Sequence, residues 1–506
     1  MIPISSHSSH LRRFQGLMLC ALGAIFLQGC TVGPRYKTPS FQAPPVFKES
    51  APQQAPDGTT WDPAKPNDAA LRGKWWEIYQ EPELNSLEDK LNTDNQSIAQ
   101  SFQNFMAARA LVRQARSNYF PTVSIGASYT RARSSGSEGS IQLNGQTLSS
   151  SELTPPNDFS LPIDVSWQPD VWGRVRNTVR EYANAAQVSA ADLANERLSV
   201  QANLAIYYFE LRGQDAQIAL YQQTIEVYKR SLTLTKTLNT TGVDNQQSVA
   251  QAELNLKSAE SALTNLRIAR AQYEHAIALL IGQPASSFSL ASKSLTTAAP
   301  AVPAGLPSEL LQRRPDIAAA ERTMAQANAL IGVQTAAFYP SFSITAEGGL
   351  QSSTIGNWFT WPSRFFSIGP SASETIFDAG SRRALLANYK AQYQADVAAY
   401  RQTVLTAFQQ TEDYLAAQRL LAEQLKQQQA VIDAAQKYYD LALTRYRVGV
   451  DSYLDVSTAQ TSLLTQQQTA VTLRTQQMTS NVQLIEALGG GWNQSQLPSE
   501  RAVAHK

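Results

Sequence analysis

The stretch TGVDNQQSVAQAEL, residues 241–254, has a close counterpart in VGVDSYLDVSTAQT, residues 448–461. In both, a glycine follows a long run of polar and aliphatic residues, and small or aliphatic side chains then recur every three or four positions. A glycine in this setting is typical of the turn between two helices. The two stretches therefore predict two helical hairpins, with turns at Gly242 and Gly449.

The similarity extends well beyond these stretches. Three glycines of the first copy recur 207 residues later, namely Gly173, Gly242 and Gly282 at Gly380, Gly449 and Gly489. Upstream, Pro121 corresponds to Pro340, so the first copy has 12 more residues between its proline and its first glycine. Matching spacings of this kind indicate an internal tandem duplication. We expect repeat 1 to span residues 86–290 and repeat 2 to span residues 291–490.

Long segments of each copy contain no proline. The chain has 24 prolines, yet residues 170–283 and 371–497 have none. Because proline disrupts helix interiors, and because Ala, Gln, Leu and Glu favour helices, these segments predict helical hairpins over about 172–282 and 378–488. A heptad pattern of small and aliphatic residues after Gly242 predicts coiled-coil packing between the helices.

The predicted helices are too long to be membrane spans. A helix from Gly173 to about Asn239 would be roughly 100 Å long at ~1.5 Å per residue, whereas a bilayer core is about 30 Å thick. Such helices extend far beyond any membrane that they touch.

Four short stretches alternate between apolar and small polar residues, which predicts β-strands. They cover about 121–131, 159–168, 340–350 and 365–376. Aromatic residues at their ends are typical of strands that face lipid. The alternative is a soluble sheet with one buried face. The long polar loop 131–158, and helices that all leave the strands on one side, favour a membrane β-barrel.

Four strands cannot close a barrel, because single-chain barrels have at least about eight. Unpaired edges do not persist in hydrocarbon, because their backbone groups would lack hydrogen bonds. The barrel must therefore be shared between chains. Two chains would supply eight strands and three would supply twelve; the strand pattern excludes a monomer and leaves this choice open.

The N-terminus predicts export. Two basic residues, Arg12 and Arg13, precede the apolar stretch FQGLMLCALGAIFLQGC at 14–30, which predicts a signal peptide over residues 1–29. The ending LQGC resembles a bacterial lipobox, which would make Cys30 the lipidated first residue of the mature chain; an ordinary secretory signal is the alternative. Thr31 after the cysteine favours the outer membrane.

Composition argues against an enzymatic activity and against nucleic acid as a partner. The chain has 42 basic and 41 acidic residues, so no strong positive field is expected. Its four histidines, His7, His10, His275 and His505, provide little material for a catalytic or zinc site. We expect no enzymatic activity, no metal and no cofactor apart from the lipid on Cys30.

Several motifs together resemble the TolC-like outer-membrane efflux lipoproteins of the NodT branch, which serve resistance–nodulation–division pumps. They include CTVGPRYKTP (30–39), WWEIYQEPELNSLEDKLNTDN (75–95), LPSELLQRRPDI (306–317), FDAGSRR (377–383) and RYRVGVDSYLDVSTAQTSLL (445–464). The resemblance covers nearly the whole mature chain. One departure is Arg35, where the family pattern usually has aspartate.

The resemblance implies a mainly α-helical protein with a transmembrane β part. Three chains would share a twelve-strand barrel in the outer membrane, which continues into an α-helical barrel across the periplasm. The implied function is a passive, gated conduit for small molecules such as drugs, supplied by a periplasmic adaptor and a proton-driven inner-membrane pump. Residues 30–85 would form a lipidated N-terminal periplasmic segment and residues 491–506 a C-terminal tail. The alternatives are a channel for type I protein secretion or metal-ion efflux and, outside transport, a secreted coiled-coil scaffold.

The resemblance also implies a gate at the helix turns. Asp455 matches an aspartate of an acidic ring that narrows the pore, and a solvated helix carboxylate is the alternative. Tyr446 and Arg447 match residues whose hydrogen bonds hold such channels shut, although core packing is an alternative for Tyr446. Asp244 and Asp451 each follow a turn glycine. Each of them therefore belongs to the gate or, as the alternative, caps the helix that follows.

Overall fold

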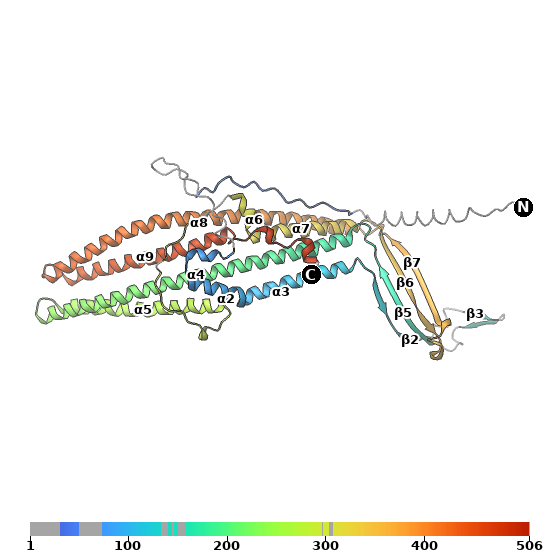
Figure 1. Cartoon of the computed structure of the whole chain (residues 1–506), viewed down its shortest axis with the longest axis horizontal. Coiled ribbons are helices and arrows are strands. Elements are labelled where there is room, and N and C mark those ends of the chain that lie inside the picture. Colours follow the sequence, from blue (N-terminus) through green and yellow to red (C-terminus); the bar gives the residue numbers. More distant parts are fainter. Residues whose placement is uncertain are drawn as a thin grey trace.

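The computed structural model describes residues 31–49, 73–132, 140–143, 146–149, 157–295, 297–302 and 307–504. Figure 1 shows an elongated molecule with a β-sheet at one end and long helices that run away from it to the other end. The predicted signal peptide and Cys30 lie outside the described residues. Within the described ranges, no helix combines the length and the apolar character needed to cross a bilayer.

The helices come in two matching sets. The long helices α4 (Arg174–Thr240) and α8 (Ser381–Arg447) each have 67 residues. The helices that return from their tips, α5 (Gln246–Leu280) and α9 (Tyr453–Ala487), each have 35. The helices that precede the strands, α3 (Gln96–Ser117) and α7 (Pro315–Ala336), each have 22.

Both hairpin turns contain a glycine in the left-handed region, with φ of 76° at Gly242 and 75° at Gly449. A side chain is disfavoured in this conformation, which explains the glycine at each turn.

Shorter elements surround the middle of the long helices. The helical ones are α2 (Pro82–Asp94), α6 (Leu310–Arg313) and α10 (Glu500–Ala504). The 3₁₀ turns are η2 (Trp75–Tyr79), η4 (Ala285–Ser287), η5 (Pro307–Glu309), η6 (Ile355–Asn357), η7 (Trp361–Ser363) and η8 (Gln494–Gln496). The largest hydrophobic cluster lies where η2 and α2 pack on α4; its fully buried members include Trp75, Tyr79 and Phe209.

The sheet is antiparallel, with the order β1–β5–β6–β7, and β2 also pairs with β5. Its strands are β1 (Thr122–Ile125), β2 (Ser128–Arg131), β5 (Asn157–Trp167), β6 (Ser341–Ser352) and β7 (Arg364–Ser373). A separate hairpin of β3 (Ser140–Leu143) and β4 (Gln146–Ser149) lies within the stretch 131–158, for which the sequence predicts a loop.

The strand predicted over about 121–131 is interrupted in the structure, where it forms two strands, β1 and β2. Both pair with β5 in one continuous register, so the break is local. Gly126 donates a hydrogen bond to the Pro162 carbonyl at 3.2 Å, but Pro162 has no N–H to return one. A proline in the middle of the partner strand therefore interrupts the ladder.

The register gathers the apolar side chains on one face of the sheet. Cross-strand pairs on this face include Val123 with Val165, Ile125 with Ile163, and Ala346 with Ile368. The other face carries the polar pairs, such as Ser166 with Thr345 and Asp164 with Glu347. Residues such as Val123, Ile125, Phe366 and Ile368 are well exposed within a single chain.

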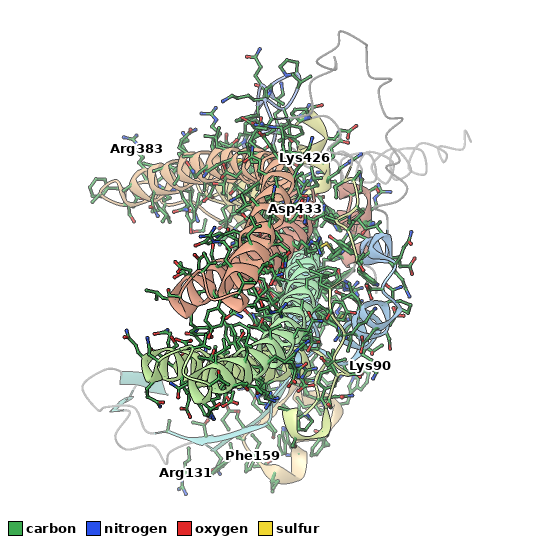
Figure 2. All side chains as sticks on the ribbon, turned by 90° about the vertical axis from the view of Figure 1, so that its left-hand side faces the viewer. Lys90, Arg131, Phe159, Arg383, Lys426 and Asp433 are labelled. Carbon is green, nitrogen blue, oxygen red and sulfur yellow. The ribbon has the colours of Figure 1, made fainter. Side chains whose placement is uncertain are left out.

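The long helices form an arc. Seen from the end opposite the sheet (Figure 2), α8, α9, α4 and α5 follow one another around a concave side, while α2, with Lys90, lies on the convex side. The end members, α8 and α5, do not meet to close a ring in one chain. This arc of helices, which we call the helical wall, is therefore open along α8 and along α5.

Candidate gate at the helix tips

The first tip is organised by Asp244 and Asn245. The side chain of Asn245 caps α5 by accepting a hydrogen bond from the Ser248 N–H at 3.0 Å. The Asp244 carboxylate instead accepts from the Ser248 hydroxyl at 2.8 Å and from the Asn245 N–H at 2.7 Å. The expected capping role of Asp244 was therefore wrong: the helix begins one residue later, and this carboxylate is left to bind elsewhere.

The partner of Asp244 comes from the second hairpin. The Tyr446 hydroxyl donates to Asp244 Oδ2 at 2.6 Å, between residues 202 apart in the chain. Tyr446 is 4% exposed, and its ring packs edge-on against Tyr453 at 5.6 Å. The ring of Tyr446 is therefore part of the core, and its hydroxyl links the tips of the two hairpins.

This bond shifts both pKa values. Burial raises the pKa of the Tyr446 hydroxyl, and the hydrogen bond to Asp244 raises it further. Burial also raises the pKa of the Asp244 carboxyl, but the hydrogen bonds from Tyr446, Ser248 and Asn245 outweigh it, and the net pKa lies below the ordinary value. The bond therefore joins a neutral phenol to an ionised carboxylate, which is a strong type of hydrogen bond.

The second tip is held by a different pair. Arg445 donates two hydrogen bonds to Asp451, at 2.6 and 2.8 Å, in a fork-like geometry. These bonds lower the pKa of the Asp451 carboxyl. Asp451 does not cap α9, so this expected role was also wrong. Ser452 is the cap, and Asp455 completes a capping box with it.

Asp455 and Arg447 are both exposed. Asp455 Oδ2 accepts from the Ser452 N–H at 3.2 Å and from the Ser452 hydroxyl at 2.8 Å. The side chain of Arg447 makes no hydrogen bond or ion pair with any residue that the structure describes. The five candidates thus separate into a linked pair (Tyr446 and Asp244), two residues with local partners (Asp451 and Asp455) and one exposed cation (Arg447).

Beneath the tips, the hairpins are joined by small and polar residues. Gln460 on α9 donates to the Ser231 hydroxyl on α4 at 2.8 Å, and Asn255 on α5 donates to the Ser457 hydroxyl on α9 at 2.7 Å. Small buried residues such as Ala252 and Ala459 allow close packing beside these bonds.

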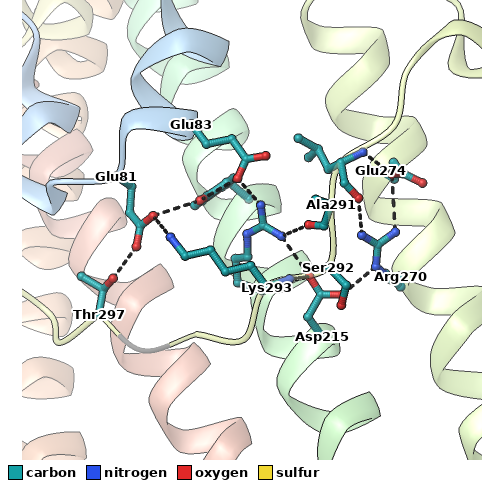
Figure 3. A network of polar contacts seen from close by, with 12 residues as sticks. Glu81, Glu83, Asp215, Arg270, Glu274, Ala291, Ser292, Lys293 and Thr297 are labelled. Atoms are coloured by element: carbon teal, nitrogen blue, oxygen red, sulfur yellow. Dashed lines mark hydrogen bonds and ion pairs between the residues drawn. The ribbon is translucent and has the colours of Figure 1, made fainter.

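A second polar site, which no sequence pattern had indicated, is a network of acidic and basic side chains (Figure 3). Asp215, on α4, has a fully buried carboxylate that accepts from Arg212 at 3.0 Å and from Arg270 at 2.7 Å. The Ser292 hydroxyl and the Lys293 N–H complete its partners. All four lie far from any motif, and two belong to a connecting loop, so no local pattern could have revealed the network.

This network ties the start of α2 to the long helix α4 and to the loop that follows α5. Glu81 accepts from Lys293 at 2.7 Å, and it also pairs with Thr297. Glu83 pairs with Arg212. In the network around Asp215, acidic and basic groups face one another, so it fits a structural role; we call it the clamp around Asp215. Within the described ranges, no group of three or more His, Cys, Asp or Glu residues is arranged to hold a metal ion.

Comparison with known proteins gives one consistent result. The family described as "Outer membrane efflux protein" matches residues 87–283 and 306–490. The toluene efflux pump outer membrane protein TtgC of Pseudomonas putida is 34% identical over 485 residues, which cover 94% of this chain and 96% of TtgC. The antibiotic efflux pump outer membrane protein ArpC of Pseudomonas putida is also 34% identical, with the same coverage.

The fold matches solved structures as well. The outer-membrane channel OprN superimposes with a TM-score of 0.81 at 28% identity, covering 92% of this chain and all of OprN.

Proposed function

Because this chain belongs to the outer membrane efflux protein family, we propose that three copies of it close a continuous channel through the outer membrane. The chain is an outer membrane component of an efflux pump, as the sequence resemblance predicted. Its family members are channels, and the proposed role is passive conduction of small molecules to the exterior.

The observation that carries this proposal is the pair of unpaired sheet edges. In the described part of the chain, β7 is paired only with β6, and the other edge, formed by β1 and β2, is paired only with β5. Backbone groups cannot remain unpaired in hydrocarbon. Each β7 would therefore pair with β1 and β2 of the next copy, with the apolar face toward lipid and the polar face toward the lumen.

The helical wall supports the same closure. Large apolar side chains are exposed on both of its edges: Leu254, Ile268 and Leu279 on α5, and Leu405, Leu420 and Leu441 on α8. Contact between α8 of one copy and α5 of the next would cover both sets. With β1 and β2 counted as one interrupted strand, because they share one register on β5, three copies give the twelve strands that the resemblance implies, whereas two would give eight. Cyclic closure of this kind needs only one type of interface.

The channel works with other proteins. Relatives of this chain are outer-membrane components of efflux pumps, which implies a periplasmic adaptor and an inner-membrane pump as partners. In the proposed arrangement residues 30–85 lie in the periplasm with a lipid on Cys30, repeats 1 and 2 occupy residues 86–290 and 291–490, and residues 491–506 form a tail. The adaptor would meet the helix tips, where Val243, Val448 and Val450 are exposed.

The gate is assigned to the same tips. In the proposed closed state, Tyr446 and Asp244 join the two hairpins of one copy, and Arg445 and Asp451 brace the second turn. The exposed residues Arg447 and Asp455 are available to neighbouring copies, where Asp455 would contribute to an acidic ring that favours cations.

The proposal is tested with the full-length protein purified in detergent. We expect a mass of three chains by light scattering with detergent correction, and stepwise conductance in planar bilayers. Deletion of the gene should increase drug susceptibility, and Cys30→Ser should abolish palmitate labelling while conductance persists. A detergent-free soluble monomer without conductance would refute the channel.

A further inference from the structure

A polar cavity of about 660 Å³ lies close to the sheet, away from the helix tips. One wall is the N-terminal arm, defined here as residues 31–36, which follows the predicted lipidation site directly. The other walls are the first turns of α4, which contribute Arg180 and Asn184, and the middle of α7, which contributes Arg322. Glu500 of α10 lies at its side.

The arm is fixed in place, so the cavity is formed in advance. The Val32 N–H donates to the Trp172 carbonyl at 3.1 Å, and the Val32 carbonyl accepts from Asn177 at 3.1 Å. A β-carbon on Gly33 would lie only 2.7 Å from the Gly332 backbone, so the arm lies directly on α7. A fixed wall lowers the entropy cost of binding a ligand.

The cavity carries more positive charge than its neighbours neutralise. Arg35, Arg180 and Arg322 line it. Arg322 forms an ion pair with Glu321 at 2.7 Å, but neither Arg35 nor Arg180 pairs with a carboxylate in the part of the chain that the structure describes. Guanidinium groups without a carboxylate are suited to a phosphate, which they bind through two parallel hydrogen bonds.

The cavity also offers acceptors beside these cations. Asn184 is 4% exposed, and its Oδ1 has no hydrogen-bond partner among the described residues. Burying such an oxygen without a donor is costly. The Glu500 carboxylate adds a second acceptor at the side of the cavity. A ligand that suits all of these groups has an anionic phosphate joined to a hydrogen-bond donor, as in phosphoethanolamine.

Its position suits a lipid headgroup. Arg180 and Asn184 lie six and ten residues beyond Arg174, where α4 begins, which is roughly 9 and 15 Å along the helix at ~1.5 Å per residue. The β5 strand ends just before α4 begins. If the sheet spans the hydrocarbon, the cavity opens near the headgroups of the periplasmic leaflet.

We propose that this cavity binds the phosphate and amine of a phospholipid headgroup in the inner leaflet of the outer membrane. Arg35 and Arg180 hold the phosphate, and Asn184 and Glu500 accept hydrogen bonds from the amine. The inference rests on the proposed function, because that function places the sheet in the membrane. The bound lipid would add a further contact between the N-terminal arm and the base of the barrel.

The test uses the full-length protein in a phosphate-free detergent and isothermal titration with three probes. They are dihexanoyl-phosphatidylethanolamine, inorganic phosphate and dihexanoylglycerol, which lacks the phosphate. We expect the phospholipid to bind at least about tenfold more tightly than inorganic phosphate, and dihexanoylglycerol not to bind. The double variant Arg35→Gln/Arg180→Gln should weaken phospholipid binding by about tenfold or more.

The matched control is the double variant Arg383→Gln/Arg401→Gln, which removes two exposed arginines of α8 outside the cavity. It should bind as the unchanged protein does. Equal binding by the Arg35/Arg180 variant, or by dihexanoylglycerol, would overturn the site. Equal affinity for inorganic phosphate would overturn the lipid assignment and leave a free-phosphate site. Conductance of the same preparations tests the channel separately, since a conducting protein without phospholipid binding refutes only this inference.

Discussion

Glu88, on α2, is fully buried, and neither of its carboxylate oxygens has a hydrogen-bond partner among the described residues. Burial raises the pKa of this carboxyl well above its ordinary value, and Asp89 raises it further. The folded protein therefore keeps Glu88 protonated at pH values where the unfolded chain, with a pKa of about 4.3, ionises it. The contribution of Glu88 to the free energy of unfolding is therefore fully present below about pH 4.3, the pKa in the unfolded chain, and is lost as the pH rises above it.

We predict that Glu88→Gln increases stability at neutral pH, because an amide has no charge to desolvate. The gain should be about 1 kcal/mol or more at pH 7.5 and should disappear near pH 4. Thermal unfolding followed by circular dichroism between pH 4 and 8 measures it. Glu77→Gln on the preceding 3₁₀ turn η2, where Glu77 is exposed, is the control and should change little; a gain of equal size there would contradict the desolvation of Glu88 as the cause.

Tyr446 gives a second prediction at this scale. Tyr446→Phe keeps the buried ring and removes the hydrogen bond to Asp244, which is worth about 1.5–3 kcal/mol for a charged partner. Since this bond joins the two hairpins, we expect a higher conductance of the resting channel in planar bilayers and greater antibiotic entry in cells. Tyr438→Phe, at an exposed tyrosine of α8, is the control. Unchanged resting conductance in Tyr446→Phe would remove this bond from the gate.

Between elements, α4 and α9 approach each other closely at Gly213. A β-carbon there would lie 3.0 Å from Thr475 Cγ2 and nearer still to its hydroxyl oxygen. We predict that Gly213→Ala pushes the helices apart and lowers the melting temperature, although alanine itself favours a helix. Adding Thr475→Ala should restore much of the loss. A double variant no more stable than Gly213→Ala would show that the contact is not the cause.

The elements themselves could be predicted from local patterns. Segments without proline and the repeated glycines were enough to place α4, α5, α8 and α9, because both features act through the backbone of a single segment. The helix caps were harder: Asp244 and Asp451 follow the turn glycines, but the turns continue for one more residue, and Asn245 and Ser452 take the cap. The side chain just before the capping residue is then free to bind elsewhere.

Contacts between distant segments could not be predicted. The bond between Tyr446 and Asp244 depends on how far one hairpin slides along the other, and no local pattern determines that register. The break between β1 and β2 depends on Pro162 in another strand. The clamp around Asp215 depends on a loop that returns to α4. In each case the information lies in a partner that is remote in the sequence.

At the scale of the whole molecule, the duplication explains why one chain forms a wall and not a tube. Two sets of helices of 67 and 35 residues lie side by side as an arc, and both ends of the arc expose apolar residues. In the described part of the chain the sheet repeats this arrangement, with two unpaired edges and one apolar face. A single repeating contact between copies would therefore complete the helical wall and the sheet together.

The two faces of the sheet give the sharpest test of this arrangement, because neighbouring residues of β7 alternate between them. Ile368 belongs to the apolar face, opposite Ala346, whereas Ser367 belongs to the polar face, opposite Glu347. We predict that Ile368→Lys prevents insertion, since a lysine facing lipid costs about 2–4 kcal/mol near the bilayer midplane, and each closed oligomer would carry the cost in every copy.

Ser367→Lys should be tolerated, because its side chain would point into a water-filled lumen beside Glu347, where its charge is favourable. The measurement is folding into liposomes, followed by the heat-resistant oligomer on gels and by conductance. Both variants carry the same added charge one residue apart, so a difference between them reports the face alone. If both insert equally well, or if Ser367→Lys alone fails, the apolar face does not meet lipid and the shared barrel is wrong.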